Sequence, residues 1–281
     1  MFFAQLYNEL WKLFGKKRTY IGFGAFVLAQ CAMLLLFKYT RWQSHLEQLL
    51  FVNGYVASEY VSALTVALIM VFPQAALLMP LYVALVGGDL IAKEAEDGTL
   101  RMILCRPISR VRLLIVKWLG GMIFAAVLVL ALGITALSTA RVLFPWHGMF
   151  VGAESADNMA FGLFPPGQGL ELYAFSHLFM VVNAFTMLSI AFMFSGFNMK
   201  PAAATILALS YFLADFIMLH LPFLEEYHNW FITHHFESWF LVFQQPTPWP
   251  QIFQSEVTLL AISATAFVIG AMGFQVRDIK S

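Results

Sequence analysis

The sequence predicts an all-α, polytopic membrane protein, and three observations support this fold class. Of the 281 residues, 60% are hydrophobic and only 11% are charged, whereas an ordinary soluble domain is about 25% charged. The mean hydropathy is +0.76. Six apolar runs are long enough to cross a bilayer, and basic residues gather on one side of them. The formal net charge is zero, and we expect no nucleic-acid partner.

Each apolar run approaches the roughly 20 residues that a spanning helix needs. The predicted spans are Tyr20–Phe37, Val61–Val86, Trp118–Ala140, Leu172–Ser195, Ala202–Leu221 and Val257–Phe274. Pro73 and Pro80 predict a kink or local unwinding in the second span, because proline removes a helical hydrogen bond. Between the spans we expect a tight turn at residues 196–201, a short surface helix within Arg41–Glu59 and an irregular loop over His147–Gly169.

The orientation follows from the distribution of Lys and Arg. With six spans, both termini share one side with the second and fourth connections. That side holds 13 of the 16 basic residues: Lys12, Lys16, Lys17, Arg18, Lys93, Arg101, Arg106, Arg110, Arg112, Lys117, Lys200, Arg277 and Lys280. Only Lys38, Arg41 and Arg141 lie on the other side. Because cytoplasmic loops carry an excess of Lys and Arg, we expect both termini in the cytoplasm.

Residues 1–19 are predicted to form a separate helix in the inner membrane interface. Phe3, Leu6, Leu10 and Leu13 repeat at helical spacing, and a basic cluster at residues 16–18 ends this apolar stripe. An early start of the first span is the alternative, although Gly15 and the basic cluster interrupt the pattern. Residues 20–281 are then a single transmembrane domain.

The most polar stretch of the chain is Gly87–Lys117, GGDLIAKEAEDGTLRMILCRPISRVRLLIVK. Its apolar residues recur at helical intervals, so we expect two short helices with sharp corners. Gly98 interrupts the first helix and Thr99 can cap a new one, while Pro107 makes the next corner and Ser109 caps the helix after it. An element of this kind, rigidly joined to the second and third spans, suits docking into a groove on a soluble partner.

This stretch resembles the cytoplasmic signature of permease subunits of type-2 (type V) ABC exporters. The family pattern, D-x-I-x-x-E-x-E-x-G-T-L followed by L-x-x-P-[VI]-S-R and a lysine, is matched by Asp89, Ile91, Glu94, Glu96, Gly98, Thr99, Leu100, Leu104, Pro107, Ile108, Ser109, Arg110 and Lys117. Ala95 and Cys105 stand where the family often has Arg and Ser. The ending GFQVRDIKS is similar to the basic tail of the family at Phe274, Arg277, Asp278 and Ile279.

The resemblance implies that a coupling helix between spans two and three fits a cleft on the ATPase subunit. The coupling residues it implies are Asp89, Glu94, Glu96, Gly98, Thr99, Leu100, Arg106, Pro107, Ser109 and Arg110. Glu94 and Glu96 are expected to face basic residues of that partner. Arg106, Arg110 and Arg112 are expected to face acidic residues or anionic headgroups. Charges at the rim of an interface mainly determine register and association rate.

No phosphate-binding G-x-x-x-x-G-K-[ST] occurs in the chain. The chain is therefore expected to be no enzyme and to hold no cofactor, with ATP and Mg²⁺ bound by a separate ATPase subunit. Two copies, or two related permeases, would pair with two ATPases in the inner (plasma) membrane, surrounded by lipid. The leading interpretation is an exporter permease. One alternative is a mechanotransmitting permease that drives a periplasmic partner or a metal-maturation apparatus, and another is a membrane-embedded metal-dependent hydrolase.

Two further polar features lie outside the signature. The aromatic segment Pro222–Pro250 is expected to form short amphipathic or re-entrant helices at the outer face. Its potential metal ligands, which are His228, His234, His235, Glu225, Glu226 and Glu237, match no known ligand spacing, and we expect no metal. Asp215 lies inside the fifth span, where an ionisable group suggests a pathway function. A structural hydrogen bond to Ser210, Tyr211 or a polar group of another span is an equal alternative.

Overall fold

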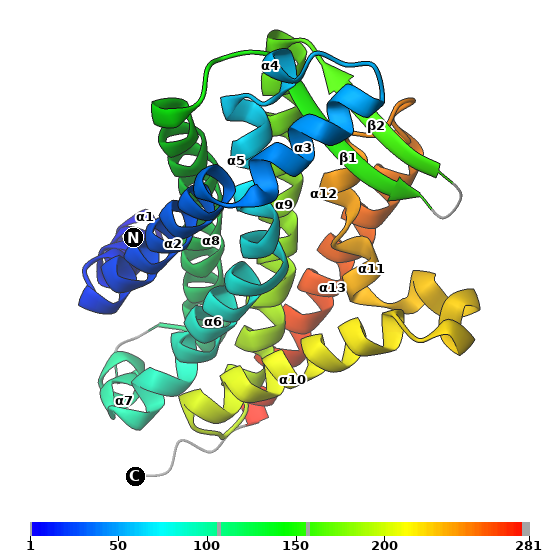
Figure 1. Ribbon diagram of the computed structural model, residues 1–281. Coiled ribbons are helices and arrows are strands. Elements are labelled where there is room, and N and C mark those ends of the chain that lie inside the picture. Colours follow the sequence, from blue (N-terminus) through cyan, green and yellow to red (C-terminus); the bar gives the residue numbers. More distant parts are fainter. Residues whose placement is uncertain (1, 106–107, 156–157, 277–281) are drawn as a thin grey trace.

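The computed structural model describes residues 2–105, 108–155 and 158–276 and is 84% helical. Within these residues six helical stretches are long and apolar enough to cross a membrane, as the sequence predicts. They are α2 (Lys17–Tyr39), the stretch Ala63–Glu96, α8 (Arg110–Leu143), α9 (Pro166–Gly196), α10 (Pro201–Leu219) and α13 (Trp249–Val276). Figure 1 shows them as one bundle.

The helix α9 forms the centre of this bundle. In the most apolar 18-residue stretch of α9, 67% is buried inside the protein, compared with 22% in the corresponding stretches of α2 and α10. Its buried face carries small residues, among them Ser176, Ala184, Ser189 and Ala191, which let neighbouring helices approach closely. The helices α6, α8 and α13 pack around it, so α2 and α10 are the peripheral helices.

The second span is interrupted between its two prolines. It consists of α5 (Ala63–Pro73), the π-helix η1 (Gln74–Leu78) and α6 (Met79–Glu96). The local unwinding predicted from Pro73 and Pro80 is confirmed. Gln74 at the start of the π-helix is buried. The Nε2 of Gln30 in α2 donates to the carbonyl oxygen of Leu132 at 3.0 Å and lies 3.4 Å from Oε1 of Gln74.

The N-terminal segment forms a helix that is separate from the first span. The helix α1 (Phe2–Phe14) ends before Gly15, and α2 begins at Lys17. Leu13 is buried, whereas Phe3, Tyr7 and Trp11 are 65–82% exposed along the opposite side of α1. An apolar aromatic stripe on a short surface helix is typical of a membrane interface. The interfacial position itself stays a prediction.

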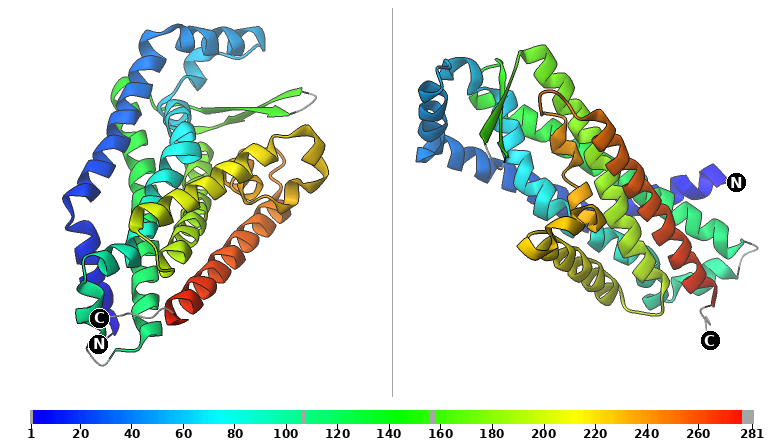
Figure 2. Two further views of the ribbon diagram at one scale, coloured as in Figure 1. Left: turned by 90° about the horizontal axis from the view of Figure 1, so that it is seen from below. Right: turned by 90° about the vertical axis from the view of Figure 1, so that its right-hand side faces the viewer.

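The bundle has two chemically different ends. Figure 2 shows α1, the C-terminal end of α13 and the short helix α7 (Thr99–Leu104) at one end, which we call the basic end. The other end, called the distal end, carries α3 (Arg41–Val52), α4 (Ala57–Tyr60) and a β-hairpin.

The hairpin is a correction to the irregular loop expected over His147–Gly169. The strands β1 (Met149–Ser155) and β2 (Asn158–Phe164) are antiparallel, with Met149 opposite Phe164 and Ser155 opposite Asn158. Met149 and Phe164 are buried at its base, and the backbone N–H of Phe150 donates to Oγ1 of Thr65 at 2.9 Å. Glycines interrupt the alternating pattern in both strands, which hid them in the sequence.

Candidate functional site

The polar segment between the second and third spans is built as an extension of both spans. The helix α6 continues without a break to Glu96, and α8 begins at Arg110. The only separate helix described between them is α7, at one end of which Leu100 is buried. We expected two short helices in this segment, and the first of them is wrong, because residues 90–96 belong to the continuous helix α6. Ala, Leu, Lys and Glu dominate residues 90–96, and these residues propagate a helix rather than end it.

Gly98 makes the corner between α6 and α7. Its φ of +72° lies in the left-handed region that favours glycine, and its N–H donates to the carbonyl oxygen of Ala95. The Oγ1 of Thr99 donates to the carbonyl oxygen of Glu94 at 3.3 Å, so Thr99 completes the end of α6 instead of capping α7. The predicted cap on α8 is confirmed, because Oγ of Ser109 accepts from the backbone N–H of Arg112.

The two glycines that open the segment seat α6 against α9 and α10. A Cβ at Gly87 would lie 2.7 Å from the carbonyl oxygen of Leu188, and a Cβ at Gly88 would lie 2.4 Å from Oγ1 of Thr205. Oγ of Ser195 also accepts from the backbone N–H groups of Ile91 and Ala92. This close packing makes the α6 extension a rigid part of the bundle.

Glu94 lies inside the protein and not on its surface. It is 5% exposed, and its carboxylate is paired with Lys12 of α1 and with Lys117 of α8, the latter at 2.7 Å. Nζ of Lys117 also lies 3.1 Å from Oε1 of Glu9. These four side chains, which we call the ion-pair quartet, join α1, α6 and α8. The expectation that Glu94 faces basic residues of a partner is corrected by this burial.

Asp89 also makes an internal contact. Its carboxylate is paired with Arg18 at the start of α2, and its side chain is only 10% exposed. The two carboxylates thus lie five residues apart on α6, and each holds a different part of the N-terminal region. From the sequence, Lys12 and Arg18 were interpreted as indicators of orientation, and Arg18 also as part of the basic cluster that ends the apolar stripe; neither was expected to form an internal ion pair. Glu9, however, lies three residues from Leu6 and four from Leu13, within the apolar stripe, and a charge at such a position requires a partner.

Glu96 and Asp97, in contrast to Glu94, are exposed. Lys93 bridges Glu96 and Asp97 at 2.9 and 3.2 Å, with about half of each side chain exposed. Met102 and Cys105 are exposed near the end of α7. Nη1 of Arg110 donates to the carbonyl oxygen of Gln275 and links α8 to the end of α13. The expected coupling residues Arg106 and Pro107 lie outside the described residues.

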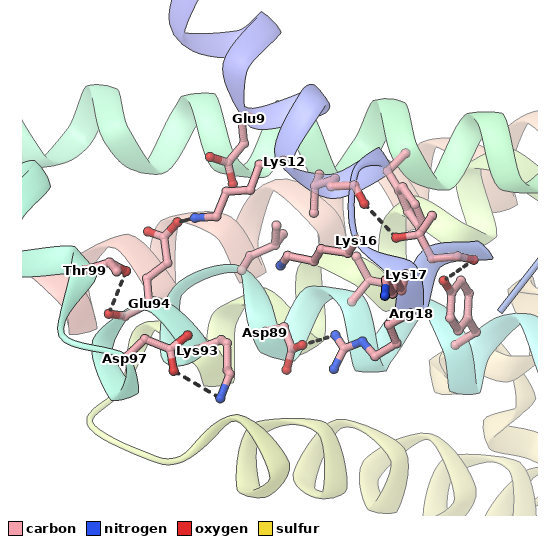
Figure 3. A pocket seen from close by; sticks show the side chains of 16 residues that line it. Glu9, Lys12, Lys16, Lys17, Arg18, Asp89, Lys93, Glu94, Asp97 and Thr99 are labelled. Atoms are coloured by element: carbon pink, nitrogen blue, oxygen red, sulfur yellow. Dashed lines mark hydrogen bonds and ion pairs between the residues drawn. The ribbon is translucent and has the colours of Figure 1, made fainter. Parts of the chain in front are cut away.

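A cavity of about 460 Å³ lies beside the ion-pair quartet, between α1, the start of α2 and α6. Figure 3 shows Lys16 reaching into it between the Lys12–Glu94 and Arg18–Asp89 pairs. Partial burial is the main reason that the pKa of Lys12 and that of Lys16 are lowered from their ordinary value. Asp89 opposes this lowering at Lys16.

Asp215 holds the outer aromatic segment. Its Oδ2 accepts two hydrogen bonds of 2.7 Å, from the backbone N–H and from Oγ1 of Thr233. Thr233 belongs to α11 (Ile232–His235), which follows the 3₁₀ helix η2 (Pro222–Trp230). Asp215 therefore makes a structural hydrogen bond, which was the alternative to a pathway function. Its partner is Thr233, and not Ser210 or Tyr211.

Three more buried hydrogen bonds hold the same segment. Nδ2 of Asn183 in α9 donates to the carbonyl oxygen of Phe236. His235 lies 3.0 Å from Oγ of Ser255 in α13, and Ser238 of α12 (Ser238–Leu241) donates to Glu256 of α13. Short helices, predicted from the aromatic sequence, are thus present; they lie beside α13 on one side of the bundle (Figure 1) and are attached to α9, α10 and α13.

The histidines of this segment form no recognisable metal site. Within the described residues no group of three His, Cys, Asp or Glu side chains is arranged to hold a metal ion. His235 uses both ring nitrogens in hydrogen bonds, to Ser255 and to the carbonyl oxygen of Asn229. This arrangement favours a packing function for His235.

A second cavity, of about 480 Å³, lies between η1, α10 and the outer segment. Aromatic rings dominate its wall, and Asn183, Thr233 and Glu237 contribute polar groups. Burial is the main reason that the pKa of Glu237 is raised from its ordinary value. A mostly apolar cavity of this size with a few polar groups is typical of a small-molecule site.

Six apolar helices, with one charged segment built rigidly onto two of them, are typical of a multi-pass membrane protein. The family comparison is more particular. The model of the ABC-2 family transporter proteins matches residues 11–274, and the chain belongs to this family. Such permeases are membrane components that pair with an ABC ATPase subunit and are generally not catalytic themselves. A comparison with individual curated proteins found no significant match.

Proposed function

We propose that this protein is the permease subunit of an ABC exporter, in which it couples ATP hydrolysis on a separate ATPase subunit to movement of a substrate across the inner membrane. Family membership supports the permease function. The observation that carries the coupling step is the unbroken continuation of α6 and α8 beyond the apolar core into the segment around α7.

The mechanism follows from this rigid connection. The ATPase would contact the exposed part of the segment, which includes Glu96, Asp97 and Met102. Since Gly87 and Gly88 pack α6 tightly against α9 and α10, a displacement of α7 would move α6 together with these helices. The π-helix η1 is the weakest part of the second span, and such interruptions frequently occur at functional sites. The aromatic cavity beside η1 would then change shape with it.

The chain supplies half of the proposed machine. ATP and Mg²⁺ would bind to the ATPase, and two permease chains would enclose the pathway. The excess of basic residues at the basic end supports a cytoplasmic position for α7 and for both termini. The chemistry of the aromatic cavity favours an amphipathic cargo over a strongly charged one.

The test uses two glycines with the same backbone conformation. Gly98 in the proposed coupling corner and Gly54 at the distal end have φ values of +72° and +82°, and a Cβ would meet nothing within 4 Å at either. Valine at either position costs about 1–2 kcal/mol of backbone strain. We expect Gly98→Val to lower the ATPase activity of the purified permease–ATPase complex severalfold, whereas Gly54→Val leaves it near wild type.

Membrane insertion and yield of both variants serve as the control. Wild-type ATPase activity in both variants, with normal recovery of the ATPase subunit, would remove the Gly98 corner from the coupling path. Equal loss in both would show that strain anywhere in the chain is sufficient, which also contradicts the proposal.

A further inference from the structure

The cavity beside the ion-pair quartet has more positive charge than its own acidic residues neutralise. Its wall contains five basic residues, Lys12, Lys16, Lys17, Arg18 and Lys93, and four acidic ones, Glu9, Asp89, Glu94 and Asp97. Every one of the four carboxylates is already in an ion pair with a lysine or an arginine. Lys16 and Lys17, in contrast, make no ion pair within the part of the chain that the structure describes.

Lys16 is held in an unfavourable position for a free cation. Its side chain is partly buried and points into the cavity, as Figure 3 shows. Removal from water disfavours a charged ammonium group unless an anion compensates for it. The lowered pKa of Lys16 has this cause. An anionic ligand in the cavity would remove this penalty.

The surroundings indicate where such an anion comes from. The exposed aromatic stripe of α1, formed by Phe3, Tyr7 and Trp11, lies on the helix that forms one wall of the cavity. Tyr82, Val86 and Phe124 give the cavity an apolar side. A charged end beside an apolar side, next to a helix with interfacial aromatic residues, matches the boundary between a lipid headgroup and its acyl chains.

We propose that this cavity binds the phosphate group of an anionic phospholipid, with Lys16 and Lys17 as its main cationic contacts. The volume of about 460 Å³ is sufficient for a headgroup and its glycerol. Oγ1 of Thr19 donates to the carbonyl oxygen of Leu13 at 2.6 Å and fixes the turn that presents the two lysines. The bound lipid would connect this turn to α6 at the beginning of the segment Gly87–Lys117. This inference stands independently of the proposed exporter function.

The test measures lipid retention by the full chain. Wild-type protein and the variant Lys16→Gln/Lys17→Gln are purified in neutral detergent, mixed with phosphatidylglycerol or phosphatidylcholine, and examined by native mass spectrometry. The control variant, Lys38→Gln/Arg41→Gln, removes the same charge at the distal end. We expect wild type and control to retain phosphatidylglycerol preferentially, and the lysine variant to lose about 25-fold in affinity, since each lysine near an anionic lipid contributes about a factor of five.

Three results would overturn the inference. One is unchanged phosphatidylglycerol binding by the Lys16→Gln/Lys17→Gln variant, and another is an equal loss in the control variant. The third is displacement of phosphatidylglycerol by millimolar inorganic phosphate, which would identify a free phosphate as the preferred ligand of the two lysines. In neutral detergent the melting temperature of the lysine variant should not fall below that of wild type, because neither lysine makes an ion pair among the described residues.

Discussion

At the scale of single residues, the ion-pair quartet determines how α1 is held. Removing two charges from water costs several kcal/mol each, and the attraction between them returns this only when the geometry is good. Lys117 is 1% exposed and meets both Glu9 and Glu94, so neither carboxylate is left without a partner. The quartet therefore contributes more to the position of α1 on α6 and α8 than to net stability.

A matched pair of lysines tests this interpretation. Lys117 bridges two carboxylates inside the protein, and Lys93 bridges two carboxylates on its surface. Lys117→Met leaves Glu9 without its ion-pair partner and Glu94 paired only with Lys12, and we expect the free energy of unfolding to fall by about 3–5 kcal/mol. Lys93→Met should leave the melting temperature of the purified chain unchanged. The triple variant Lys117→Met/Glu9→Gln/Glu94→Gln should recover most of the loss, and failure to recover would contradict a charge-based explanation.

Asp215 allows a second test at this scale. Its two hydrogen bonds to Thr233 need only an acceptor, which Asn also provides. We expect Asp215→Asn to keep the melting temperature and the ATPase activity of the complex between about pH 6 and 8. Asp215→Leu should lower stability by about 1–2 kcal/mol, and Thr233→Val should cost little more in that background. An Asp215→Asn variant that melts normally but loses activity would restore the pathway function.

At the scale of elements, the segment from Ile232 to Leu241 is docked by buried hydrogen bonds that include those of His235. Nε2 of His235 must donate to the carbonyl oxygen of Asn229, and Nδ1 then accepts from Oγ of Ser255. Burial is the main reason that the pKa of His235 is lowered from its ordinary value of 6.5, and the same is true of His234. At His234 and His235 the docked state thus binds fewer protons than the undocked state, whereas burial raises the pKa of Glu237 in the same segment and acts in the opposite direction.

The sign of the pH dependence follows from these depressed pKa values. The stability that neutral His235 contributes is fully present above pH 6.5, the ordinary value, and is lost as the pH falls through the depressed value. We expect hydrogen exchange of residues 232–241, corrected for intrinsic rates, to accelerate on acidification. His235→Gln should weaken this acceleration, and His45→Gln, at an exposed position in α3, should not. An unchanged acceleration in His235→Gln would assign the effect to other groups.

The elements differ in how far the sequence predicts them. Long apolar runs determine a spanning helix almost alone, so the six spans, the unwound stretch after Pro73 and the cap at Ser109 were predicted correctly. The β-hairpin was not, because its strands are stabilised by contacts at Thr65 and at the buried Met149 and Phe164, which lie far from one another in sequence. The helical end of α6 was placed wrongly for a related reason, since packing of Gly87 and Gly88 supports it.

The sequence predicted where the candidate site lies along the chain, but not which of its charged side chains are buried. Charge patterns identify a polar segment, but they do not distinguish an exposed carboxylate from one that is paired inside. Glu94 and Glu96 are two residues apart, and on a helix this spacing turns them to different faces. One meets Lys117, from a different span, and the other meets Lys93 on its own helix. Only the tertiary structure shows that Glu94 is paired inside the protein and that Glu96 is exposed on its surface.

At the scale of the whole molecule, the remaining prediction is the direction in which the bundle crosses the membrane. The basic end contains α7 and α1, and the excess of basic residues there predicts that it faces the cytoplasm. Cys105 is exposed beside α7 and is a natural probe of this end. Gly152 in β1 is exposed at the distal end, and a Cβ there would make only ordinary contact, at 3.5 Å, with the ring of Phe150.

A membrane-impermeant maleimide can distinguish the two orientations in intact cells. In a Cys31→Ser background, Cys105 should stay unlabelled until the cells are permeabilised, because the reagent cannot reach a cytoplasmic thiol. In a Cys31→Ser/Cys105→Ser background, Gly152→Cys should be labelled without permeabilisation. Labelling of Cys105 after permeabilisation shows that its earlier protection came from the membrane and not from burial. The reverse pattern would place the coupling segment outside, beyond the reach of any cytoplasmic ATPase, and would contradict both the orientation and the proposed exporter function.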